Sequence, residues 1–113
     1  IAVTYPAEHA QLAGDIVRGG GALASERLPA DSVTRWALVQ RDRLQAAHAR
    51  AVVLVESDLD GGAMHTMRFA RELGRRRFAV ASPASGNASE LAGGAVALPW
   101  NVDAALERVA AAQ

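Results

Sequence analysis

Apolar and polar positions along the chain follow two periods, which predict alternating strands and helices. The clearest strand is the run AVVLVE at residues 51–56, whose continuous β-branched character is typical of a parallel strand buried on both faces. Shorter apolar runs predict further strands at 1–4, 22–25, 77–82 and 95–98. Helical spacing predicts helices within 7–18, 36–50, 63–74, 83–94 and 102–113. The spacing of the first rests on Leu12, Ile16 and Val17, and Leu38, Leu44 and Ala47 are candidates for the buried stripe of the second.

Strands that alternate with helices indicate an α/β protein with a Rossmann-like, doubly wound fold. We expect a mostly parallel sheet with helices on both faces. The length of 113 residues fits one domain covering 1–113. The chain begins abruptly at Ile1 without an initiator Met, so we expect this domain to be truncated at its N-terminus.

Composition narrows the possible chemistry. Cysteine is absent, which excludes disulfides and thiolate catalysis. The three histidines, His9, His48 and His65, lack metal-ligand spacing. We therefore expect no metal and no cofactor. No run approaches the ~20 apolar residues of a membrane span, and a cytoplasmic location is the simplest interpretation. The net charge is zero, with 12 basic residues that are all Arg. A neutral balance argues against broad capture of nucleic acid, so any phosphate site must be local.

Ligands of open α/β sheets collect beyond the carboxyl ends of the strands, where three loops should meet. These loops contain Ser25, residues 56–66, and residues 82–87 with Gly86 and Asn87. In the central loop, Gly61 and Gly62 permit positive φ and close approach of a ligand, and the helix that follows would offer free N–H groups to an anion. Thr66 could add a hydroxyl, and His65 could contact the ligand or be structural. The alternative is that the two glycines only form a tight turn. No catalytic constellation is evident.

Basic residues outside the loops allow two interpretations. Arg41 and Arg43 bracket Asp42 in QRDR, and they form either a phosphate clamp or a solvated helix face. The densest basic run, GRRRF at 74–78, precedes a strand and should lie at the opposite edge of the sheet. We interpret it as compensation of a helix C-terminal dipole together with ordinary surface.

Five partial motifs follow one another along most of the chain. They are Tyr5-Pro6, Leu12, Ile16, Gly20-Gly21 and Ser25-Glu26; LVQRDRLQ with Arg41 and Arg43; GGAMHTM with Gly62 and Thr66; Ala70, Gly74, Arg75 and Phe78 to Val80; and Gly86-Asn87, Leu91 and Gly94-Ala95. In this order and spacing the chain resembles the Rossmann-like domain of the DprA (Smf) family of DNA-processing proteins. It departs from the family where Asp42 replaces an Asn between the arginines, and where the first half of the family domain, with its GSR and SGGARGID loops, is missing.

The resemblance implies a protein without enzymatic activity that binds single-stranded DNA, forms a homodimer and loads RecA. Arg41, Arg43 and the loop from Gly61 to Thr66 would then meet the phosphate backbone. Two alternatives stay open within the wider superfamily. One is a small-nucleotide-binding or sensing domain, which needs no basic surface. The other is a phosphoribohydrolase of the LOG type, whose PGGxGTxxE signature lacks its glutamate here, leaving Glu26 and Glu56 as imperfect substitutes.

Overall fold

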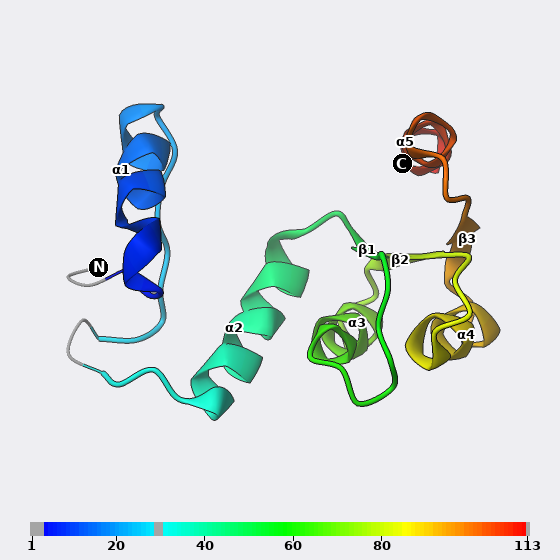
Figure 1. Cartoon of the computed structure of the whole chain (residues 1–113), viewed down its shortest axis with the longest axis horizontal. Coiled ribbons are helices and arrows are strands. Elements are labelled where there is room, and N and C mark those ends of the chain that lie inside the picture. Colours follow the sequence, from blue (N-terminus) through cyan, green and yellow to red (C-terminus); the bar gives the residue numbers. More distant parts are fainter. Residues whose placement is uncertain (1–3, 29–30, 113) are drawn as a thin grey trace. The chain divides into compact units, whose positions relative to one another are not determined.

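The structure, a computed structural model, describes residues 4–28 and 31–112. The chain divides into two compact units, Ile1–Arg35 and Trp36–Gln113. Figure 1 shows the elements in chain order. Within the described ranges, no helix is long and apolar enough to cross a membrane.

The first unit holds a short 3-10 helix, Ala7–His9, and the helix α1, Ala10–Arg18. The predicted helix is therefore confirmed, although the apolar residues that set its spacing, Leu12, Ile16 and Val17, are exposed and Ala13 is its one buried residue.

The strand predicted at 22–25 is also wrong: this segment is irregular and exposed. A strand needs a neighbour to satisfy its backbone groups, and no strand is found in the described part of this unit. The strand predicted at 1–4 lies outside the described residues except for Thr4, which belongs to no element.

The second unit is a three-layer α/β arrangement. Its elements are α2 (Arg35–His48), β1 (Ala51–Leu54), α3 (Ala63–Glu72), β2 (Arg76–Val80), α4 (Ser85–Ala92), β3 (Val96–Leu98) and α5 (Val102–Ala111). The three strands are parallel in the order β1-β2-β3, and the register aligns Val53 with Phe78 and Phe78 with Val96. The predicted parallel α/β fold is thus confirmed.

Side chains alternate along β2, and those on both faces are apolar, so both faces of the sheet are covered by helices. On one face, Ala79 packs with Leu54 of β1, Met67 of α3 and Ala95. On the other face, Phe78 and Val80 pack with Leu98 of β3 and with α5. Figure 1 shows α3 and α4 on one side of the strands and α5 on the other.

The expectation that β1 is buried on both faces is wrong. Leu54 is buried, whereas Val53 and Val55 are exposed. β1 is an edge strand, and the core on the α5 face is centred on β2 and β3, so the outer part of β1 on that face is left uncovered. The helix α2 contributes to neither core cluster; its Ala37 and Ala46 are buried, while the predicted Leu38, Leu44 and Ala47 are only half-buried.

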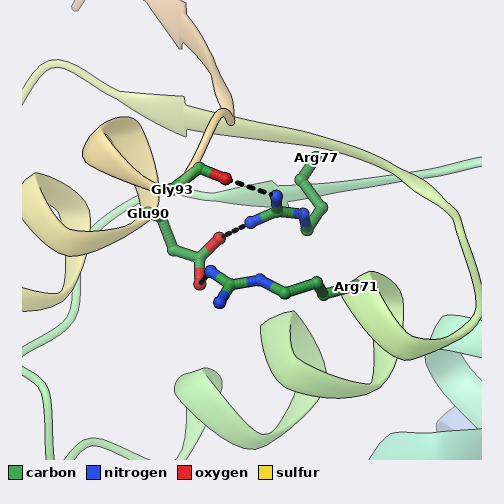
Figure 2. Close-up of polar contacts among 4 residues, drawn as sticks. All are labelled: Arg71, Arg77, Glu90 and Gly93. Atoms are coloured by element: carbon green, nitrogen blue, oxygen red, sulfur yellow. Dashed lines mark hydrogen bonds and ion pairs between the residues drawn. The ribbon is translucent and has the colours of Figure 1, made fainter.

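A buried carboxylate joins α3, β2 and α4 at the amino end of β2 (Figure 2). Glu90 is 3 % exposed, and its two carboxylate oxygens pair with Arg71 at 3.0 Å and with Arg77. Arg77 also donates to the carbonyl oxygen of Gly93, the C-cap of α4, at 2.8 Å. No motif in the sequence indicates this cluster. The only sequence signal was the spacing of Glu90 three residues after Asn87, which places both on the sheet-facing side of α4.

Candidate functional site

Of the three loops predicted to converge at the carboxyl edge of the sheet, those after β1 and β2 do meet there. Ser82 Oγ donates to Glu56 Oε1 at 3.2 Å, and Ser85 Oγ donates to Asp58 Oδ1 at the same distance. The amide of Leu59 donates to Ser85 Oγ at 3.1 Å. Residues far apart in sequence therefore form one surface beyond the strand ends.

Asn87 holds this edge together from inside. Its side chain is fully buried at 0 % exposure. Its Oδ1 accepts from the amide of Ser57 at 3.0 Å, and its Nδ2 donates to the carbonyl oxygens of Val55 and Val80, both at 2.9 Å. Both N–H donors of the side-chain amide are thus engaged. We had expected Asn87 to contact phosphate, but its burial and its filled donors give it a structural role instead.

Gly86 has a structural role for a different reason. Its amide donates to Ser57 O at 2.9 Å, so this donor is not available to a ligand. A Cβ at this position would lie 2.4 Å from Ser57 O and 2.8 Å from Met64 Sδ, which real structures do not tolerate. The glycine allows the start of α4 to approach the β1–α3 loop closely, and the expected ligand contact is replaced by this packing requirement.

The backbone conformation of the glycine pair before α3 differs from the prediction. Neither Gly61 nor Gly62 has a positive φ. A Cβ at Gly61 would lie 2.2 Å from Ser57 Oγ and 3.0 Å from Asp58 O, so a larger residue there would require the Ser57 side chain to shift. Gly62 is the N-cap of α3, and nothing lies within 4 Å of where its Cβ would be. Gly62 therefore leaves the backbone open to approach.

The first turn of α3 presents free donors. In the described part of the chain, the amides of Gly62 and Ala63 have no acceptor, and no side chain caps the helix. The amide of His65 bonds to Gly62 O at 3.1 Å, and the side chains of His65 and Thr66 are half-buried beside it. These donors and the positive end of the helix dipole suit an anion.

Acidic side chains oppose that anion. Glu56, Asp58 and Asp60 all lie in the loop that leads into α3. From the sequence, Glu56 is expected only as an imperfect substitute for a catalytic glutamate, and no role is predicted for Asp58 and Asp60. Like charges this close to the donors weaken the attraction of a phosphate, and they favour a ligand that also carries hydroxyl or amino donors.

The remaining predicted residues lie outside these loops. Ser25 belongs to the first unit, where its Oγ accepts from the amide of Arg27 at 3.0 Å. Arg41 and Arg43 lie on α2; Arg41 pairs with Asp42 Oδ1 at 3.6 Å, and Arg43 is half-buried. The structure thus brings Gly61, Gly62, His65, Thr66, Gly86 and Asn87 into one region. Among the described residues, Arg41 pairs with Asp42 on its own helix and forms no hydrogen bond or ion pair with these six residues. Within residues 4–28 and 31–112, no group of three His, Asp or Glu side chains could hold a metal ion.

Comparison with known proteins agrees with the fold and the motifs. Residues 1–109 match the family model of DNA recombination-mediator protein A. The chain is 41 % identical over 87 residues to the putative DNA processing protein DprA of Mycobacterium tuberculosis, covering 77 % of this chain and 22 % of that protein. It is 36 % identical over 87 residues to protein Smf of Escherichia coli, covering 76 % and 23 %.

A solved structure extends the likeness to three dimensions. DNA processing protein A from Streptococcus pneumoniae superposes with a TM-score of 0.72 at 25 % identity, covering 85 % of this chain and 35 % of that one. The chain spans less than a quarter of the length of the curated relatives named above. From the family match over nearly its whole length, the chain belongs to the DprA (Smf) family of DNA-processing and recombination proteins.

Proposed function

We propose that the chain binds single-stranded DNA through its phosphate backbone as part of DNA recombination. The observation that carries this proposal is the start of α3, where the amides of Gly62 and Ala63 have no acceptor in the described structure and Gly62 leaves open space. Two adjacent N–H groups at a positive helix end form a phosphate-sized cradle. Thr66 and His65, one turn into the helix, would complete the contact.

Arg41 and Arg43 would add the charge that this loop lacks. Arg41 is more than half exposed, and its contact with Asp42 is long at 3.6 Å, which leaves N–H groups of its guanidinium for a phosphate. The same contact partly neutralises Asp42, the residue that departs from the family motif.

The family supports further proposals about partners. We expect the DNA to be handed to RecA, in the cytoplasm, by a homodimer. Exposed apolar side chains near the last strand and helix, Trp100, Val102 and Leu106, would suit the contact with a second copy.

A small-nucleotide sensor is the second candidate, and the acidic loop favours it. Glu56 and Asp58 are held by Ser82 and Ser85 at the same edge as the free amides. Carboxylates repel a polyanion but accept hydrogen bonds from ribose hydroxyls and base amino groups. A mononucleotide has one phosphate for the start of α3 and such donors for the acidic loop. Glu56 is also the residue that a phosphoribohydrolase would need, and release of free base from a nucleoside monophosphate would reveal that activity.

The deciding experiment is titration of a labelled single-stranded oligodeoxynucleotide at low and moderate salt, with mononucleotides as competitors. DNA binding should tighten with oligonucleotide length, and its logarithmic salt slope should steepen by about 0.7 for each phosphate contacted. Affinity that is independent of length and abolished by mononucleotides would replace this proposal with the sensor.

Substitutions on α2 test the arginine clamp. Arg41→Gln and Arg43→Gln should each weaken oligonucleotide binding, and Asp42→Asn should strengthen it by removing like-charge repulsion. Arg18→Gln is the matched control, because Arg18 is an exposed arginine paired with Asp15 in the first unit. If Asp42→Asn lowered affinity, this part of α2 would not lie near the bound phosphates.

A further inference from the structure

The amino edge of the sheet carries a cavity of about 280 Å³, on the side away from the predicted site. Three consecutive arginines, Arg75–Arg77, line it together with Phe78, Gly94, Val96 and Ala112. From the sequence, this run is expected to compensate a helix dipole and to form ordinary surface.

Two of the three arginines are held in place by the protein. Arg77 is 12 % exposed and is engaged with Glu90 and the carbonyl of Gly93. Arg75 Nη2 donates to Ala47 O at 2.7 Å, which leaves other N–H groups of its guanidinium available. Dipole compensation is therefore part of the explanation, because both carbonyls belong to helix ends.

Arg76 is different. Side chains alternate along β2, so Arg76 lies on the same face as Phe78, opposite to Arg77. It is exposed, and among the described residues it has no hydrogen bond or ion pair. Among the three arginines that line the cavity, Arg76 is thus unengaged and Arg75 is only partly engaged.

The charge balance leaves a surplus at this edge. Arg71 and Arg77 share the single negative charge of Glu90. The carbonyl oxygens of Ala47 and Gly93, at the negative ends of α2 and α4, offset part of the charge of Arg75 and Arg77. Arg76 has no such partner among the described residues, so its positive charge is the surplus.

The size of the cavity sets the class of ligand. Its volume of about 280 Å³ leaves room for a phosphate group, and the cavity is open to solvent, so a longer ligand can extend out of it. Guanidinium groups bind phosphate with paired hydrogen bonds. Phe78 is buried and offers no exposed ring for a base to stack on.

We propose that Arg75 and Arg76 hold a backbone phosphate of a bound nucleic-acid strand in this cavity. The inference rests on the proposed DNA binding but places a contact at the edge of the sheet opposite to α3's first turn. A strand held there would meet surplus positive charge, whereas the loop before α3 presents three carboxylates.

The test compares Arg76→Gln with Arg68→Gln in titrations of a labelled single-stranded oligonucleotide. Arg68 is an exposed arginine paired with Glu72 outside the cavity, so both variants lose one charge. Arg76→Gln should weaken binding about tenfold at low salt, the effect of losing one charge-assisted hydrogen bond. It should also make the salt slope shallower by about 0.7. Arg68→Gln should change affinity by no more than about twofold.

The outcomes separate this inference from the proposed function. If the chain binds DNA and the two variants have equal, small effects on affinity, the phosphate site in the cavity is refuted and the proposed DNA binding is not. A chain that binds no oligonucleotide at any salt would overturn both.

Amide NMR of the unchanged chain provides a second measurement that needs no substitution. Shifts of Arg76, Gly94 and Val96 on addition of the oligonucleotide support the site, and shifts confined to Gly62 and Ala63 overturn it. If pyrophosphate alone moved the same amides at equal concentration, the ligand would be a free phosphate compound, and the nucleic-acid assignment would be wrong.

Discussion

Asn87→Asp separates a structural from a ligand-binding role at the carboxyl edge. The substitution keeps the shape and the acceptor for the Ser57 amide, but it removes both donors and places a carboxylate oxygen 2.9 Å from the carbonyls of Val55 and Val80. Each lost hydrogen bond contributes about 1 kcal/mol, and each buried acceptor left unsatisfied costs about 1–3 kcal/mol. We expect the free energy of unfolding to fall by about 3–5 kcal/mol at neutral pH.

Asn101→Asp is the matched control for this change. Asn101 is the exposed N-cap of α5, and its Oδ1 accepts from the amide of Ala104 at 2.9 Å. Aspartate caps a helix as well as asparagine and adds a favourable charge at the positive helix end. This variant should therefore have unchanged or slightly higher stability in urea unfolding followed by circular dichroism.

The pH dependence gives a second readout. Burial against two carbonyl oxygens favours the neutral form of the introduced carboxyl. The destabilisation should therefore shrink as the pH is lowered and be smallest below about pH 3.9, where an aspartate is also protonated in the unfolded chain. A loss in Asn87→Asp no larger than in Asn101→Asp, and independent of pH, would refute the structural role.

Two further substitutions test the packing around the sheet. Glu90→Gln should lower the free energy of unfolding by about 2–4 kcal/mol, because it leaves the nearly buried Arg77 without a counter-charge, whereas Glu72→Gln, in the exposed pair with Arg68, should change it by less than about 1 kcal/mol. Similar urea midpoints for the two variants would show that the buried carboxylate contributes little. Gly86→Ala should destabilise by about 1–3 kcal/mol through overlap with Ser57 O, while Gly62→Ala should be neutral or stabilising by about 0.5 kcal/mol. Thermal unfolding of both variants checks this, and a stable Gly86→Ala chain would contradict the close approach.

The secondary structure of the second unit could be predicted better than that of the first, because local sequence signals determine its elements. β-branched runs, a glycine-opened helix and regular spacing identify β1, α3, β2, α4, β3 and α5 within a few residues of their observed bounds. Ala22–Ser25 has the same apolar character as a strand, but pairing depends on a neighbour that no local pattern reveals. The prediction that Val53 is buried was wrong for the same reason. Its exposure follows from the position of β1 at the edge of the sheet, which depends on the order of the strands.

The candidate site shows a similar division. Convergence of the two loops could be predicted, because it follows from parallel strands and short connections. The use of Gly86 and Asn87 could not, since a glycine and an asparagine at a helix start suit a ligand and a close packing contact equally well. Only the positions of Ser57, Val55 and Val80 decide between them. The surplus charge at Arg76 likewise depends on which neighbouring arginines find partners.

The polar clamps at the two ends of β2 have a consequence for how the strand finds its place. Shifting β2 by two residues would keep every side chain on its original face. In one direction, however, the slip would bring Arg76 to the place of the buried Phe78, so the core itself opposes it. In either direction the slip would also pull Val80 O away from Asn87 and Arg77 away from Glu90. Two polar side chains on the same helix, one at each end of a short strand, therefore add to the core in fixing the register of the sheet.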